Sequence, residues 1–128
     1  MRVSVRIGKD TVLALKELEK ILPRSSDEKM TNGDILTYSW KLISTEVDSI
    51  DWLKVADLDI FSIVTSQEDV TGVNTTMNID DDVEASLNDF KFSLTREFGQ
   101  FIYFPYVVKL VLFGAILIKR NKLSEYKK

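Results

Sequence analysis

The 128-residue chain contains no cysteine, no histidine, two prolines and five glycines. Without cysteine it can form no disulfide, thiolate nucleophile or cysteine metal site, which favours an intracellular, cytoplasmic protein. Without histidine it lacks the commonest general base and the commonest metal ligand. The sequence also has no glycine-rich phosphate loop and no nucleophile motif. We therefore expect a protein that is not an enzyme and that needs no cofactor.

The acids Asp80, Asp81 and Asp82 follow one another and raise the question of a divalent metal site. Acidic side chains at the start of a helix cap its free N–H groups and match the helix dipole. We prefer this structural interpretation and expect no metal.

The chain does not start with the pattern of a signal peptide, because Arg2 and Arg6 interrupt any apolar run. A more serious alternative is the stretch Phe101–Ile118, which is eighteen residues long, carries one charge, and is followed by basic residues. Its length and flanking charge satisfy the crude rule for a transmembrane helix. Lys109 in its middle and Pro105 near its start argue against a span, so we expect no membrane association.

The net charge of −3 is unevenly distributed along the chain. Residues 1–44 carry eight basic and six acidic residues, and residues 74–128 carry eight and seven. Residues 45–73 carry one lysine and seven acids, a net charge of −6. The acidity is thus confined to the middle segment, and the overall charge does not exclude binding to nucleic acid.

The two ends of the chain repeat one pattern at a constant offset of 72 residues. Each copy has one short alternating strand followed by two helical segments, a unit that cannot bury its apolar face alone. Few residues are identical, so the repeat is one of pattern. The corresponding pairs are Ile7 and Ile79, Asp10 and Asp82, Leu15 and Leu87, Leu18 and Phe90, Leu22 and Leu94, Ile35 and Val107, and Leu36 and Val108.

In the first copy, residues 2–7 alternate polar and apolar side chains, which predicts a strand with one buried face. A helix capped by Asp10 or Thr11 should follow and end at Pro23. A polar connection over 24–29 leads to Thr31–Asp34, which has the form of a capping box opening a second helix.

In the second copy we expect a strand over 74–79, a helix that starts at the acids 80–82, and a last helix over about 104–121. The segment between the copies is too apolar for a plain linker, so it should form a short element packed on the core. The predicted organisation is a first repeat over 1–44, an acidic and apolar insertion over 45–73, a second repeat over 74–121 and a charged tail over 122–128. The fold class is therefore mainly α with a short β-ribbon.

A strand followed by two helices of these lengths resembles the ribbon-helix-helix superfamily, the Arc and MetJ type of DNA-binding protein. The resemblance implies that the two strands pair into an antiparallel ribbon that enters the major groove, and that the two copies form one pseudo-two-fold unit. The tandem arrangement is similar to the relaxosome accessory proteins of F-like conjugative plasmids. The insertion at 45–73 departs from the simple family unit.

The resemblance assigns base contacts to the polar face of both strands. A major groove about 12 Å wide admits a two-stranded ribbon, and arginine, asparagine and hydroxyl side chains suit its base edges. An exposed strand face is also polar when it binds nothing, so this alternative stays open. The candidate base-contacting residues are Arg2, Ser4, Arg6, Asn74, Thr76 and Asn78.

The start of the second helix is the candidate phosphate site of the first copy, because helix N-termini present free N–H groups. The residues concerned are Lys29, Thr31, Asn32 and Gly33, which would serve equally well as an ordinary helix cap. The corresponding positions in the second copy are Tyr103, Phe104 and Pro105. Because proline has no N–H, the two halves should contact DNA unequally.

The expected function is sequence-specific binding of double-stranded DNA, as a transcriptional repressor of a mobile element. The first alternative is an accessory or architectural protein in the processing of conjugative plasmid DNA. A protein–protein interaction module that has lost DNA binding is the second. The last helix is apolar on all sides, so a second molecule or the insertion must cover its extra face. Self-association through the last helix and the insertion, near Trp52 and Phe61, is therefore a further possibility.

Overall fold

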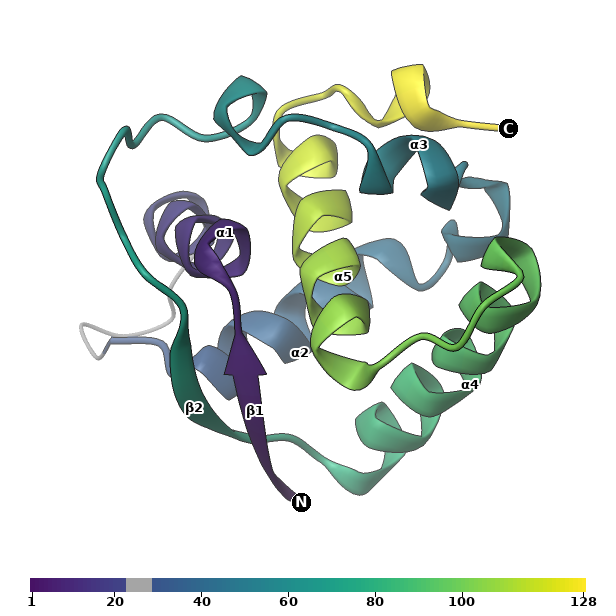
Figure 1. The fold of residues 1–128 in the computed structure, drawn as a ribbon, viewed down its shortest axis with the longest axis horizontal. Helices are drawn as coiled ribbons and strands as arrows, with labels where there is room; N and C mark the ends of the chain where they lie inside the picture. Colours follow the sequence, from purple (N-terminus) through teal and green to yellow (C-terminus); the bar gives the residue numbers. More distant parts are fainter. Residues whose placement is uncertain (23–28) are drawn as a thin grey trace.

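The computed structural model describes residues 1–22 and 29–128 and is mainly helical, with one short two-stranded sheet, as predicted. Pro23 and most of the polar connection after it lie outside the described residues. The elements are shown in Figure 1. In chain order, the strands and α-helices are β1 (Arg2–Ile7), α1 (Lys9–Ile21), α2 (Asn32–Ile43), α3 (Trp52–Ala56), β2 (Val73–Asn78), α4 (Asp81–Phe98) and α5 (Phe104–Lys119).

The strands β1 and β2 pair antiparallel, although they are separated by 65 residues of chain or more. β1 has the bounds that its alternation predicts, and β2 begins and ends one residue earlier than expected. Val5, Ile7 and Met77 are buried on the inner face of the ribbon. The period-two pattern of β1 thus separates a core face from an outer face, as half-buried strands do.

Helix α1 begins at Lys9, directly after β1, with Gly8 as its N-cap. The prediction that Asp10 or Thr11 caps this helix is therefore wrong. Asp10 lies in the first turn, where its charge still matches the helix dipole. Gly8 adopts extended backbone angles and supplies no side-chain cap, so one residue suffices to turn the chain from strand to helix.

Helix α2 starts with the predicted capping box. The backbone N–H of Asp34 donates to the Thr31 hydroxyl at 3.1 Å, and the Thr31 N–H donates to the Asp34 carboxylate at 3.1 Å. The helix start also lies against the ribbon. A Cβ added at Gly33 would meet the carbonyl oxygen of Asn78 at 2.3 Å, so this close approach of α2 to β2 requires glycine.

Helix α5 is the centre of the molecule, and α1, α2, α3, α4 and β1 all pack against it (Figure 1). Its apolar side chains are covered by the chain itself, which explains why the helix is apolar all round. Of the two ways in which the extra face could be covered, the structure shows the insertion, whose helix α3 packs on α5. No helix among the described residues is long and apolar enough to cross a membrane. The buried residues of α5 are Val107, Val108, Leu110, Val111, Leu112, Phe113, Gly114, Ala115, Ile116 and Leu117.

The middle segment forms α3 and two 3₁₀ turns, Val47–Ser49 and Ile60–Ser62, and it packs on the core. Trp52 is 2% exposed, so it is a core residue and not a surface for a second molecule, whereas Phe61 is 39% exposed. Gly114 of α5 makes room for the indole, because an added Cβ would lie 3.2 Å from Cη2 of Trp52.

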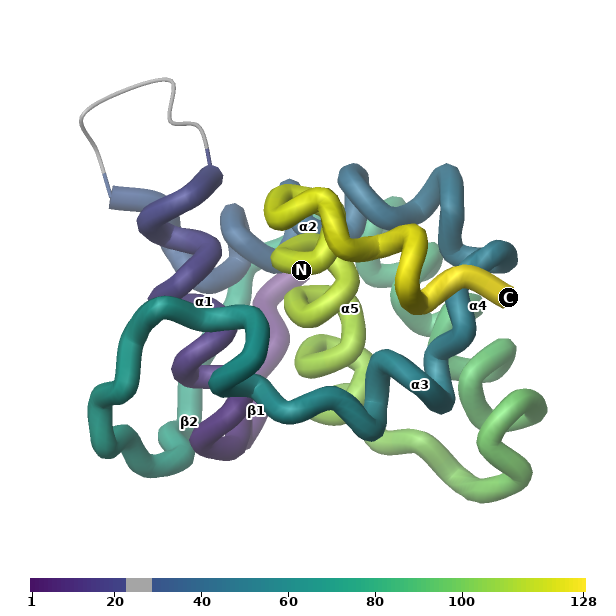
Figure 2. The backbone as a smooth tube through the Cα atoms, turned by 90° about the horizontal axis from the view of Figure 1, so that it is seen from above, coloured from purple at the N-terminus to yellow at the C-terminus, as the bar shows by residue number. Residues whose placement is uncertain are grey.

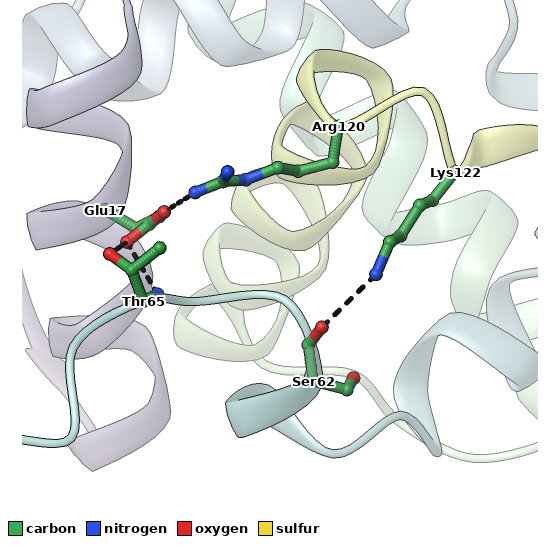
Figure 3. Close-up of polar contacts among 5 residues, drawn as sticks. All are labelled: Glu17, Ser62, Thr65, Arg120 and Lys122. Carbon is green, nitrogen blue, oxygen red and sulfur yellow. Dashed lines mark hydrogen bonds and ion pairs between the residues drawn. The ribbon is translucent and has the colours of Figure 1, made fainter.

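Between residue 62 and β2 the chain runs beside α1, as the two views in Figures 1 and 2 show. It is held there by Glu17, a buried carboxylate of α1 that accepts hydrogen bonds from the N–H and hydroxyl of Thr65 at 3.0 and 2.9 Å. Arg120, after α5, forms an ion pair with the same carboxylate (Figure 3). Burial raises the pKa of Glu17, but the bonds from Thr65 and Arg120 outweigh it and lower the pKa overall.

Candidate nucleic-acid interface

The outer face of the ribbon brings the predicted base-contacting residues together. The register pairs Arg2 with Asn78, Ser4 with Thr76, and Arg6 with Asn74. All six side chains are exposed, and none of them is acidic. The antiparallel pairing thus turns two separate sequence patterns into one continuous hydrogen-bonding surface.

The ribbon surface carries two cations that the described protein does not neutralise. Arg2 and Arg6 form no ion pair or hydrogen bond with the residues that the structure describes. A free guanidinium keeps five N–H donors in a fixed planar arrangement. The arginines stand at opposite ends of β1, and an asparagine lies opposite each of them on β2. Donors and acceptors are therefore distributed over the whole length of the ribbon.

The predicted phosphate-contacting residues lie at the start of α2, but their environments differ. Lys29 and Thr31 are exposed. The Asn32 side-chain amide donates to the Thr75 hydroxyl at 3.0 Å, and Gly33 is buried against the backbone of Asn78. The charge and the hydroxyl are thus at the surface, while Asn32 and Gly33 fasten the helix to the ribbon. The assignment of Lys29, Thr31, Asn32 and Gly33 to phosphate contacts stays a prediction.

Thr75 is a residue of this site that the sequence analysis did not identify. Its side chain is on the opposite face of β2 from Thr76, and it receives the hydrogen bond from Asn32. The alternation of the strand assigns Thr75 to the inner face, where a threonine breaks the apolar pattern. A threonine on this inner face indicates a hydrogen bond to another element, because a partly buried hydroxyl needs a partner.

The start of α5 occupies the opposite end of the ribbon from the start of α2. Pro105 and Lys109 line a small cleft with Gly8 and Lys9, which follow the last residue of β1. Tyr103 is the N-cap of α5, and no side-chain cap bond forms there. The two helix starts therefore flank the ribbon, but their chemistry is different.

Aromatic side chains stand at the positions 72 residues after Lys29 and Thr31. Phe101 and Tyr103 are 63% and 69% exposed, and their rings pack edge to face with centroids 4.8 Å apart. The ammonium of Lys91 lies 5.4 Å from the centre of the Phe101 ring. This flank thus presents two exposed aromatic rings and one lysine.

The contacts of α2 and α5 are reciprocal. Helix α2 packs against β2 and α4, and helix α5 packs against β1 and α1, while α2 and α5 pack against each other. In each of the apolar pairs related by the offset of 72, from Ile7 and Ile79 to Leu36 and Val108, both members are buried. α1 and α4 start 72 residues apart, as do α2 and α5.

Comparisons with protein-family models, with curated proteins and with solved structures found no match to this chain.

Proposed function

We propose that the chain binds duplex DNA sequence-specifically by inserting its ribbon into the major groove. The observation that carries this proposal is the outer face of the ribbon, which has six exposed hydrogen-bonding side chains and no acid. Two of the six are arginines that pair with none of the residues that the structure describes. A purely structural surface needs polarity but not this exclusion of acidic residues. A surface that approaches phosphates needs polarity and also the absence of acidic residues.

The individual side chains suit base recognition. Arg2 and Arg6 are suited to bidentate contacts with guanine, and Asn74 and Asn78 to the N6 and N7 edge of adenine. The hydroxyls of Ser4 and Thr76 accept or donate and so tolerate several bases. Because the arginines all come from β1 and the asparagines from β2, the recognised site should be asymmetric.

The unit that presents this ribbon is, in our proposal, a tandem ribbon-helix-helix repeat with pseudo-two-fold symmetry. It is supported by the reciprocal packing of α2 on β2 and of α5 on β1, and by the common offset of the helix starts. One chain then supplies both halves of a recognition unit. Lys29 and Thr31 contact phosphate at one flank, with Asn32 and Gly33 placing the helix start against the groove.

Part of the acidic middle segment fits this orientation. Helix α3, which Asp51 and Asp57 cap, lies on the other side of α5 from the ribbon (Figure 1), whereas Glu68 and Asp69 belong to the stretch that leads into β2. We assign the protein a cytoplasmic role as a transcriptional repressor of a mobile element, with an accessory role in plasmid DNA processing as the nearest alternative.

Selection from a pool of random duplexes at moderate salt tests the proposal. Purified protein should enrich a short asymmetric motif, and Arg6→Ala should abolish the enrichment. Arg96→Ala is the matched control, because Arg96 is also an exposed arginine but lies on α4. Weak, salt-sensitive binding of all duplexes without a motif would contradict specific recognition, as would equal loss in both variants.

A protein–protein interaction module is the second candidate function. It is favoured by the exposed aromatic side chains of Phe92, Phe101 and Tyr103, the last two of which pack edge to face at the surface. The two functions separate experimentally. Replacement of Arg2 and Arg6 by alanine should abolish binding in a DNA-binding protein and leave the binding of an interaction module to its partner unchanged. Replacement of Phe101 and Tyr103 by serine should abolish binding in the interaction module.

A further inference from the structure

A cleft of about 320 Å³ lies where the start of α1 meets the first turns of α5, at the end of the ribbon that carries Arg6. The proposed phosphate contacts of Lys29 and Thr31 lie at the opposite end of the ribbon, so the proposed function does not use this cleft. Its lining residues are Gly8, Lys9, Asp10, Thr11, Pro105, Tyr106 and Lys109.

The α1 side of the cleft presents backbone N–H groups without partners. The first hydrogen bond of the helix runs from the Val12 N–H to the Gly8 carbonyl at 3.0 Å, so the N–H groups of residues 9, 10 and 11 precede it. No side chain caps these three groups, and they donate to no other group in the described part of the chain. Free N–H groups and the positive end of the helix dipole attract an anion.

The Thr11 side chain points to a ligand at this helix start. Thr11 lines the cleft and is only 3% exposed, yet its hydroxyl forms no hydrogen bond with any described residue. Among the described side chains, only Ser39 Oγ and Arg120 Nε are both fully buried and without a partner, so the Thr11 hydroxyl opens to the cleft. A nearly buried hydroxyl without a partner lowers stability, and a ligand in the cleft would supply the partner.

The cleft also brings two lysines together without an acid partner. Lys9 and Lys109 form no ion pair with the residues that the structure describes. Lys109 is partly buried, and its ammonium lies 5.4 and 5.6 Å from the centres of the Tyr106 and Phe113 rings, which attract the cation but do not neutralise it. The acid of the cleft is Asp10, so two lysines and one aspartate leave a net charge of +1.

We propose that this cleft binds a phosphate group. The N–H groups at the start of α1 and the Thr11 hydroxyl donate hydrogen bonds to the phosphate oxygens, and Lys9 and Lys109 balance the charge. The source of the group rests on the proposed function: it is a backbone phosphate of the duplex at the Arg6 end of the ribbon. The start of α1 thereby supplies the phosphate contact that Pro105, which has no N–H, withholds at the start of α5.

Titration with inorganic phosphate, followed by the backbone amide signals in a ¹H–¹⁵N correlation spectrum, tests the site without DNA. The signals of residues 9–11 should shift saturably, with a dissociation constant on the order of 1–10 mM for an ion of this size. Sodium chloride at equal ionic strength should not reproduce the shifts.

The start of α4 is the internal control, because it also lacks a side-chain cap but has Asp81, Asp82 and Glu84 in its first turn and no lysine there. Its amide signals should not respond to phosphate. Unsaturated shifts at residues 9–11, or equal shifts at the start of α4, would overturn the site.

Variants identify the groups responsible. Thr11→Val removes the hydroxyl and keeps the shape, so it should weaken phosphate binding by about three- to tenfold. Its melting temperature should stay the same or rise, because the hydroxyl has no partner in the described protein. Lys109→Met should also weaken binding by about threefold or more, and Asp10→Asn should strengthen it.

Lys20→Met is the control, because Lys20 is an exposed lysine in the last turn of α1 and lies outside the cleft. It should leave phosphate binding unchanged. A Thr11→Val variant that is less stable but binds phosphate as the wild type does would assign the hydroxyl to the fold and overturn the proposal.

The duplex that the ribbon selects identifies the source of the phosphate. Thr11→Val and Lys109→Met should lower the affinity for all duplexes alike and leave the selected motif unchanged. Lys109→Met should also reduce the salt dependence of binding by about one phosphate contact. Phosphate binding with unchanged DNA affinity in both variants would overturn the assignment to the DNA backbone and leave a free phosphate ester as the ligand. Failure of the wild type to select any motif would overturn the proposed function, whereas the titration with inorganic phosphate would be unaffected.

Discussion

Replacement of Gly33 by alanine should separate α2 from the ribbon. An added Cβ would lie 2.3 Å from the carbonyl oxygen and 2.8 Å from the nitrogen of Asn78. Ordinary contacts between such atoms are about 3.4 Å or longer, so the helix start must move by about 1 Å. The obstructing atoms are backbone, and no side-chain rotation can relieve the contact.

The expected cost follows from two opposing effects. Overpacking of this kind costs about 1–3 kcal/mol, and the better helix propensity of alanine returns up to about 1 kcal/mol. We therefore expect a net loss of about 1–2 kcal/mol in the free energy of unfolding. For a chain of this length that loss lowers the melting temperature by roughly 4–8 °C.

Urea unfolding followed by tryptophan fluorescence measures the change, and thermal unfolding by circular dichroism gives the second value. Gly8→Ala is the control, because no atom of the described residues lies within 4 Å of a Cβ added at Gly8, and its backbone angles suit any residue. If Gly33→Ala were as stable as the wild type, or no less stable than Gly8→Ala, the close docking of α2 on β2 would be refuted. Because Asn78 is a proposed base contact, DNA affinity should fall together with stability.

Three other substitutions test separate parts of the fold. Gly114→Val should destabilise by about 2 kcal/mol and shift tryptophan emission, because its side chain enters the space of Trp52; an unchanged melting temperature would refute this packing. The pKa of Glu17 is lowered in the folded state, so its contribution to stability is present above its ordinary value of 4.5 and is lost as the pH falls. Glu17→Gln should therefore flatten the acid limb of a stability–pH curve measured by urea unfolding, whereas Glu68→Gln, at an exposed ion pair, should leave most of it. Thr31→Ala should cost about 1 kcal/mol in thermal unfolding through loss of the capping box, and Thr31→Ser should recover most of that.

The elements that local pattern defines were predictable from the sequence. The alternation of residues 2–7 gave both bounds of β1, and the spacing of Thr31 and Asp34 identified the capping box. These features depend on neighbours within four residues. The start of α1 was missed because the rule for caps favours polar side chains, whereas the chain turns at Gly8 without one.

Features that depend on distant residues could not be derived from local pattern. Glu17 has the sequence context of a solvated helix acid, and its partners Thr65 and Arg120 lie 48 and 103 residues away. Trp52 was expected in an element packed on the core, which is confirmed, but nothing in the sequence links it to the gap at Gly114. The cleft between the starts of α1 and α5 likewise exists only once the two helices pack together. At the ribbon the strand alternation selected the outward residues, while the antiparallel pairing was expected from the family resemblance and is confirmed.

The most direct test of base recognition by the ribbon is Arg6→Lys, compared with the wild type in selection from random duplexes. Lysine keeps the positive charge, and so the attraction to phosphate, but it loses the bidentate geometry that distinguishes guanine. If Arg6 contacts a base, the variant should still enrich the motif but lose its preference at one base pair, by about tenfold or more. Arg96→Lys should change nothing. An unchanged motif in Arg6→Lys, or a uniform loss at all positions, would contradict the proposal that the outer face of the ribbon reads the sequence.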